Sequence, residues 1–327
     1  MDEIIFYYEG NTTKIKYDGN QKIREICDKF CNQINKSINS LVFKYEGSEL
    51  NMDKTFDEIK QENKNNIFVC KIDENKSSES KSEINCIYDK QDEEINLLHD
   101  YSIDKQYFKW KDYMIYKEGE KNINENNIDV YIDGNKIKFN SKYKSEVRGE
   151  IKVKFKFNKL ITSTHDMFSY CSSLKYIDLS SFNSSQVVDI GFMFFDCSSL
   201  KSIDLSRLDT SKVINMNGLF LECKNLETIN LTSLDTSNII NMNQMFCGCE
   251  SLKSIDLSSF ITNKVNDLRF LFSRCSSLKS IDLTTFKISE NCTIQGMFSD
   301  CNSLKKENIK IDDSLKRIFG EIKTIKK

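Results

Sequence analysis

A repeat of 26 residues in the second half of the chain limits what this sequence can fold into. A single row of the repeat is too short to bury its own apolar residues. The rows must therefore stack, about 4.8 Å apart, around a shared interior. Rows of equal length place like residues above one another in columns. Three columns keep the period through six rows: Cys171, Cys197, Cys223, Cys249, Cys275 and Cys301; Phe168, Phe194, Phe220, Phe246, Phe272 and Phe298; Leu174, Leu200, Leu226, Leu252, Leu278 and Leu304.

Within one row, the pattern predicts a strand, a turn and a short helix. Ile203 and Leu205 alternate with polar residues, which is typical of a strand with one buried face. Val213, Met216 and Leu219 follow at helical spacing. A column of residues suited to cap that helix precedes them: Ser185, Ser211, Ser237, Asn263 and Ser289. The sequence therefore predicts an α/β solenoid of six 26-residue repeats over residues 161–309.

The row consensus M-F-x-x-C-x-x-L-x-x-I-D-L-S resembles the BspA-like leucine-rich-repeat family over about residues 160–309. The likeness is specific, because both the spacing and the residue identities agree over several rows. It implies a curved, leucine-rich-repeat-like solenoid that binds proteins. It also implies the place at the cell surface that several members of the family have.

Both ends of a solenoid need a cap, because an open end exposes a cross-section of the interior. Ile151, Val153 and Phe155 alternate with lysines, which protect an outer edge. Residues 84–160 are therefore expected to form a β-rich N-terminal cap. An apolar stripe at helical spacing predicts a C-terminal capping helix over residues 310–327.

Residues 1–72 follow a different pattern and predict a separate small domain. Two strand-like segments, an amphipathic helix from about residue 23 to 34 and two more strand-like segments follow one another, which fits a β-grasp fold. Residues 73–83 contain several serines among charged residues and are expected to be a flexible linker.

The N-terminal segment VFKYEGSEL, residues 42–50, resembles the third strand of ubiquitin and the turn after it. Residues 55–59, TFDEI, resemble a later stretch of ubiquitin. The resemblance implies an α+β ubiquitin-like domain. Two departures bear on function: Lys44 stands where ubiquitin has an isoleucine, and Ile72 is followed by Asp-Glu rather than Gly-Gly.

Charge and hydropathy exclude several classes of partner. The net charge of −2 provides no overall basic field, so no nucleic-acid partner is expected. The chain begins with MDEIIFYYEG, which lacks the basic start of a secretory signal. It contains no run of about 18 apolar residues, so membrane insertion is not expected. These features predict a cytoplasmic protein, and the alternative is the cell surface, reached by an unrecognised route.

The cysteine column suggests either a metal site or a buried ladder of thiols. Zinc sites use ligands paired at short spacing, whereas one cysteine per row cannot surround an ion. Disulfides between rows are also disfavoured, because Cβ atoms about 4.8 Å apart are too distant for the bond. We therefore expect buried thiols in a reducing compartment, with no metal and no cofactor.

The candidate binding residues form two exposed columns beside the predicted strands. Like charges about 5 Å apart repel by about 0.8 kcal/mol in water, which a second feature must offset or use. One interpretation is a solvated face on which opposite charges neutralise one another, and the other is a docking surface for a polar or basic ligand. The columns are Asp178, Asp204, Asn230, Asp256 and Asp282, and Lys175, Lys201, Lys253 and Lys279.

No pattern in the sequence predicts catalysis. The two histidines, His99 and His165, lie in different segments, and no glycine-rich phosphate loop is present. The expected function is a non-enzymatic protein–protein interaction scaffold or adaptor that binds through the solenoid's strand face. The alternatives are a BspA-like surface or adhesion protein and an adaptor of the ubiquitin pathway that acts through the N-terminal domain.

Overall fold

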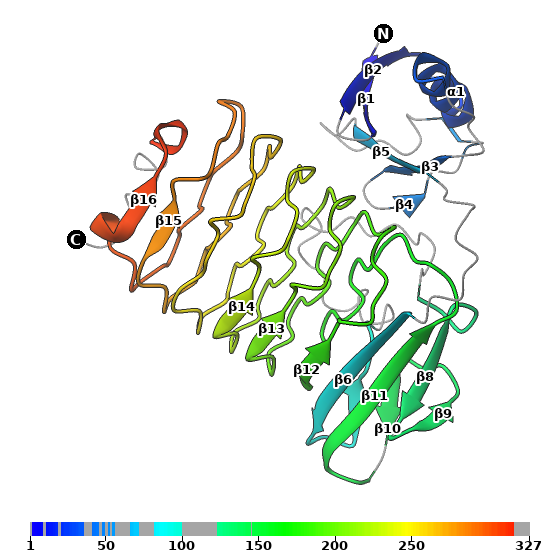
Figure 1. Ribbon diagram of the computed structural model, residues 1–327, viewed down its shortest axis with the longest axis vertical. Coiled ribbons are helices and arrows are strands. Elements are labelled where there is room, and N and C mark those ends of the chain that lie inside the picture. The colour runs from blue at the N-terminus through cyan, green and yellow to red at the C-terminus, as the bar shows by residue number, and fades with distance from the viewer. Residues whose placement is uncertain are drawn as a thin grey trace. The chain divides into compact units, whose positions relative to one another are not determined.

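The chain separates into two compact units in the computed structural model, each described here by itself (Figure 1). The first contains the described residues up to Lys71, and the second contains those from Ser82 onward. The described residues are 2–8, 11–18, 21–35, 41–45, 48–49, 52, 54–55, 66–71, 82–99, 123–144 and 146–316.

The first unit is a five-stranded sheet with one helix, α1 (Ile23–Gln33). The helix buries one apolar side, on which the Phe30 ring stacks on Phe6 with centroids 4.6 Å apart. The resemblance to ubiquitin stays a prediction, and residues 56–59 of its second motif lie outside the described residues. The strands, in the order β2-β1-β5-β3-β4, are β2 (Asn11–Tyr17), β1 (Asp2–Tyr8), β5 (Asn66–Lys71), β3 (Leu41–Tyr45) and β4 (Ser48–Glu49).

The second unit begins with an antiparallel sheet that precedes the rows and includes part of the first row. Its long strands alternate buried and more exposed side chains, so one face is apolar. The sheet order is β12 (Leu174–Asp178), β6 (Ser82–Lys90), β11 (Gly149–Phe157), β8 (Ile128–Ile132) and β9 (Asn135–Ile137), and β7 (Glu94–Asn96) pairs separately with β10 (Lys142–Lys144).

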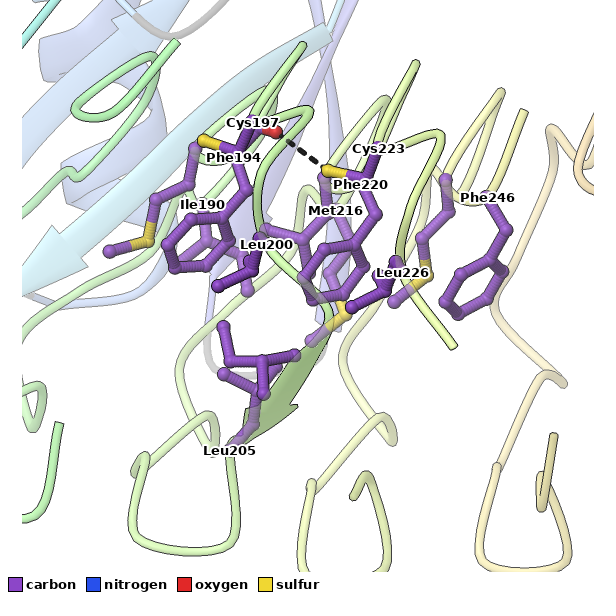
Figure 2. Close-up of a cluster of buried hydrophobic side chains, with 14 of the residues drawn as sticks. Ile190, Phe194, Cys197, Leu200, Leu205, Met216, Phe220, Cys223, Leu226 and Phe246 are labelled. Carbon is purple, nitrogen blue, oxygen red and sulfur yellow. Dashed lines mark hydrogen bonds between the residues drawn. The ribbon is translucent and has the colours of Figure 1, made fainter. Parts of the chain in front are cut away.

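The six rows stack in register. Isolated parallel bridges join every row to the next at a step of 26 residues, beginning with Ser163 to Asp189 and ending with Asp267 to Thr293. The phenylalanine column is a stack of nearly parallel rings, with centroids 5.4–5.9 Å apart from Phe168 to Phe298. Figure 2 shows Phe194, Phe220 and Phe246 lying side by side in this buried cluster.

Short strands and two 3₁₀ turns complete the rows. Strand β13 pairs with β14 and β15 pairs with β16, both in parallel, so the strand that follows the sixth turn segment pairs with the strand of the fifth row. Of the predicted capping helix, residues 310–316 contain only the end of β16 and a 3₁₀ turn, and residues 317–327 lie outside the described residues. These elements are β13 (Ser202–Asp204), β14 (Thr228–Asn230), β15 (Ile281–Leu283), η2 (Lys306–Asn308), β16 (Ile309–Ile311) and η3 (Asp313–Leu315).

The predicted α/β solenoid is wrong. The sheets of the described residues are mostly antiparallel, and α1 in the first unit is the single α-helix that they contain. Where each row was expected to be helical, it has a ribbon of turns that we call the turn segment. The six turn segments are residues 163–170, 189–196, 215–222, 241–248, 267–274 and 293–300, and we number their positions one to eight.

Hydrogen bonding explains why the apolar spacing was misread. At positions five and seven the N–H bonds back to the carbonyl three residues earlier, as from Phe195 to Phe192 at 3.0 Å. At the even positions the N–H leaves the row, as from Phe194 to Leu219 of the next row, also at 3.0 Å. Positions four and eight have positive φ in every row, which interrupts any helix. Buried positions two, five and six still have the i, i+3, i+4 spacing of a helix face.

The cysteine column forms a ladder of thiol hydrogen bonds. Each thiol from the second row onward donates to the phenylalanine carbonyl of the preceding row, as Cys223 does to Phe194 at 2.9 Å (Figure 2). Burial raises the pKa of every thiol in the column. The six cysteines are free and buried. A small thiol therefore fills the interior and also gives the phenylalanine carbonyls of the first five rows a second donor.

Candidate interaction surfaces of the rows

The predicted binding columns lie on the outer side of the strands, together with small hydroxyl side chains. We call this surface the strand face. Along the strand of the second row, Lys201, Ser202 and Asp204 are exposed, while Ile203 between them is buried. The strand face consists of Lys175, Lys201, Lys253 and Lys279, and of Asp178, Asp204, Asn230, Asp256 and Asp282.

The aspartates of the strand face close turns. In each row, Oδ1 accepts the backbone N–H of the residue two positions later, as Asp204 does from Ser206 at 2.9 Å. Hydrogen bonds from that residue lower the pKa of Asp204, and the same arrangement lowers the pKa of Asp256 and Asp282. Turn formation therefore accounts for the column without a bound partner.

Two of the four lysines of the strand face pair with acidic residues of adjacent segments. Lys175 pairs with Glu150 of β11, and Lys253 lies 3.5 Å from Glu227 of the preceding row. Exposed pairs of this kind contribute about 0–1 kcal/mol each, so they mainly balance charge. This balance favours the interpretation of a self-neutralised face, and docking at this face stays a prediction.

A second column of turn-closing residues, at position one of the turn segments, was missed by sequence reasoning. Asp189 is 3% exposed, and its Oδ1 accepts Gly191 N–H at 2.8 Å and Asn215 Nδ2 at 3.0 Å. Gly191 has no room for a side chain here, because a Cβ would lie 2.5 Å from Asn217 Oδ1. The recurring Asp or Asn of the four middle rows was the available signal, with a hydroxyl residue at this position in the first and last rows: Ser163, Asp189, Asn215, Asn241, Asp267 and Thr293.

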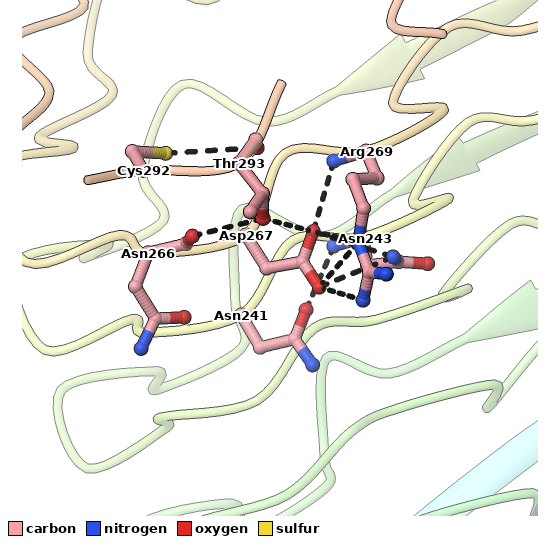
Figure 3. Close-up of polar contacts among 7 residues, drawn as sticks. All are labelled: Asn241, Asn243, Asn266, Asp267, Arg269, Cys292 and Thr293. Atoms are coloured by element: carbon pink, nitrogen blue, oxygen red, sulfur yellow. Dashed lines mark hydrogen bonds and ion pairs between the residues drawn. The ribbon is translucent and has the colours of Figure 1, made fainter. Parts of the chain in front are cut away.

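Asp267 is the most highly coordinated member of this column (Figure 3). Its carboxylate accepts hydrogen bonds from three successive rows: Asn243 Nδ2 at 3.2 Å, Arg269 Nη2 at 2.6 Å and Thr293 Oγ1 at 3.1 Å. The paired Arg269 neutralises its charge. This carboxylate joins rows together and has no geometry that suggests proton transfer.

Four other positions of the turn segment differ from row to row. Ring contacts show that they are contiguous: His165 at position three packs on Phe192 at position four, Phe192 on Phe195 at position seven, and Phe195 on Tyr170 at position eight. We call these columns the variable face. It consists of residues 165–166, 191–192, 217–218, 243–244, 269–270 and 295–296, and of residues 169–170, 195–196, 221–222, 247–248, 273–274 and 299–300.

An ion pair on the variable face spans three rows. Arg274 Nη2 reaches Glu222, although the two residues lie two rows apart. The row between them has Gly248 at this position, and the Glu222 carboxylate lies over it, 3.0 Å from where a Cβ would be. A larger residue in the middle row would therefore separate the pair. Along this column an aromatic ring, two acids, a glycine, a base and another acid follow in turn.

The remaining candidate chemistry is sparse. Among the described residues, no three His, Cys, Asp or Glu side chains are grouped so as to hold a metal ion. The His99 ring stacks on Tyr170, and His165 Nδ1 lies 3.0 Å from the Gly191 carbonyl, so the histidines contact different parts of the first two rows. No helix in the described part of the chain is long and apolar enough to span a bilayer.

Two overlapping stretches of the chain, residues 138–233 and 219–319, match the model of a family described as Mycoplasma protein of unknown function, DUF285. Together they run from residue 138 to residue 319, which is 182 of the 327 residues. No curated protein matches the chain. The matching family is not the BspA-like one, so that resemblance stays a prediction.

Proposed function

The chain belongs to the family described as Mycoplasma protein of unknown function, DUF285, a description that names no activity, and we propose that it is a non-enzymatic protein-binding scaffold that binds through the variable face. The single observation that carries this proposal is the chemical difference between rows on this face, beside the near-identity of rows on the strand face.

A surface that presents the same side chains on every row cannot fix a partner at one row of the stack. A partner that recognises one lysine and one aspartate on the strand face would find the same pair one row away, about 4.8 Å further on. It would therefore bind in several registers with similar free energy. On the variable face, Tyr170, Glu222 and Arg274 occupy equivalent positions but differ in size and charge. A partner can thus be held in a single register.

The residue types on the variable face suit a protein partner. Aromatic side chains and arginine contribute most to protein interfaces, because they bring large area or several donors for little lost freedom. Tyr170, Phe195, Phe270 and Asp196 are half-buried, and Arg274 is exposed and paired with Glu222. Burial raises the pKa of Asp196. The face therefore combines apolar area with a few charged side chains whose sign a partner can recognise.

Two matched double variants test the proposal. Glu222→Gln with Arg274→Gln removes the ion pair of the variable face and leaves a neutral amide at both positions. Glu227→Gln with Lys253→Gln does the same to an ion pair of the strand face. Proximity labelling with full-length chain in the cells that make it should lose a set of proteins with the first variant and keep that set with the second. Retention by both, or loss only with the second, would refute the proposal.

A further inference from the structure

The turn segments join the rows through four continuous chains of hydrogen-bonded peptide groups. In one such series of hydrogen bonds, Phe220 N–H donates to Met245 O at 2.9 Å. The same peptide group contains Phe246 N–H, which donates to Leu271 O at 3.0 Å. Positions two, four, six and eight each start such a chain. All five interfaces between rows contain these four bonds, and in each of these bonds the earlier row donates to the later row.

This uniform direction makes the two ends of the stack chemically different. In these four bonds the N–H groups of one row meet carbonyls of the next, so the last turn segment has backbone donors on its outer edge at positions two, four, six and eight. The peptide dipoles within each chain also point the same way, which places partial positive charge at that edge, as at the start of a helix. The donors are Ile294, Gly296, Phe298 and Asp300, and no described residue accepts a backbone hydrogen bond from them.

Burial also changes at the last row. Ser299, at position seven, is half-buried, whereas the residues at this position in the three preceding rows, Leu221, Cys247 and Ser273, are buried. Phe195, the larger side chain at this position of the second row, is half-buried as well. The four backbone donors, more than burial, therefore distinguish the outer side of the last turn segment from an interface between two rows.

The opposite end of the stack carries part of the chain itself. His99 N–H donates to Met167 O at 3.0 Å, and Asn96 Nδ2 donates to Tyr170 O at 3.2 Å. Met167 O is the acceptor that a preceding row would use. A second copy cannot continue the stack at this end while these residues occupy it. Two last-row edges cannot pair with each other either, because donors would face donors.

We propose that the outer edge of the last turn segment docks the backbone of a protein partner, a segment whose successive carbonyl oxygens accept hydrogen bonds from Ile294, Gly296, Phe298 and Asp300. The chain shows five times what this edge binds, because the same donors in rows one to five each bind a turn segment. The occupant is thus a seventh turn segment supplied by another protein, and a second copy of this chain is disfavoured. This inference does not depend on the variable face.

Amide hydrogen exchange of the full-length chain, read residue by residue, tests the first half of the proposal. Gly296 and Phe298 should exchange about 100-fold faster than Phe270 and Phe272, which have the same positions in the fifth row and donate to the sixth. Equal protection in both rows would mean that the chain already fills the edge, and it would overturn the proposal.

A peptide of residues 186–201 tests the second half, because in the chain its carbonyls at Gly191, Met193 and Phe195 accept from the row before it. At millimolar concentration it should slow exchange of the last-row donors at least tenfold, while a scrambled peptide should not. No slowing by the peptide, or equal slowing by inorganic phosphate, would overturn a backbone partner. Ser299→Arg should abolish the effect by blocking the edge, and Ser280→Arg, on the exposed strand face of the fifth row, should retain it.

Discussion

Asn215→Asp and Asn230→Asp form a matched pair of perturbations that differ in burial. Each asparagine donates Nδ2 to an aspartate Oδ1 of the preceding row, Asn215 to Asp189 at 3.0 Å and Asn230 to Asp204 at 2.9 Å. Each also closes a turn through its own Oδ1. Both substitutions keep the turn, remove one inter-row hydrogen bond and create two neighbouring carboxylates.

The magnitudes follow from the surroundings of the two acceptors. Two like charges about 4 Å apart repel by about 1 kcal/mol in water and by about 4 kcal/mol in a partly buried site. Asp189 is 3% exposed, whereas Asp204 is exposed. We expect Asn215→Asp to lower the free energy of unfolding by about 2–3 kcal/mol more than Asn230→Asp. The comparison is conservative, because Asn230 also has Asp256 on its other side.

Urea unfolding at pH 7 and at pH 3 is the assay. Repulsion from Asp189 should raise the pKa of the introduced carboxyl at residue 215 in the folded state. A raised folded-state pKa makes the penalty complete above that pKa and absent below the ordinary aspartate value, where both states are protonated. The difference between the variants should therefore shrink as the pH falls. Equal losses at pH 7, or a difference that persists at pH 3, would refute the reasoning.

Three further predictions concern the interior. Thr236→Val should lower the free energy of unfolding in urea by about 2 kcal/mol or more. The buried hydroxyl accepts a hydrogen bond from Ile261 N–H at 2.7 Å and donates one to Ile261 O at 3.1 Å, and valine can make neither bond. Gly218→Ala should cost about 2–4 kcal/mol, since φ is +58° and the Cβ would lie 2.2 Å from the Phe192 ring; Phe192→Ala in the same chain should recover part of that loss, and a double-mutant cycle without coupling would contradict the clash. Burial raises the pKa of Cys247 to about 11. The unfolded chain therefore loses this proton at a lower pH than the folded chain, and the free energy of unfolding should fall as the pH rises from about 9 toward 11. A thiol reagent should titrate all twelve cysteines only after the chain has been unfolded without reductant.

Sequence reasoning located the interior of the rows but misjudged one element within each row. The cysteine, phenylalanine and leucine columns could be picked out because apolar side chains that recur at a constant step have no alternative to a shared interior. The aspartates of the strand face were recognised as exposed, but their role in closing turns depends on a backbone N–H two residues away. The column containing Asp189 was overlooked, because a polar residue in the sequence gives no sign of its burial.

The sequence by itself determined the row length, the number of rows and the residues of the core, since each follows from a period that holds without insertion over six rows. Tertiary structure decided whether the second half of a row became a helix or a ribbon of turns. Met216, Leu219 and Phe220 have the spacing that either conformation needs to bury one side. The choice depends on the N–H groups of positions two, four, six and eight, which find acceptors in the neighbouring row and are then unavailable to a helix.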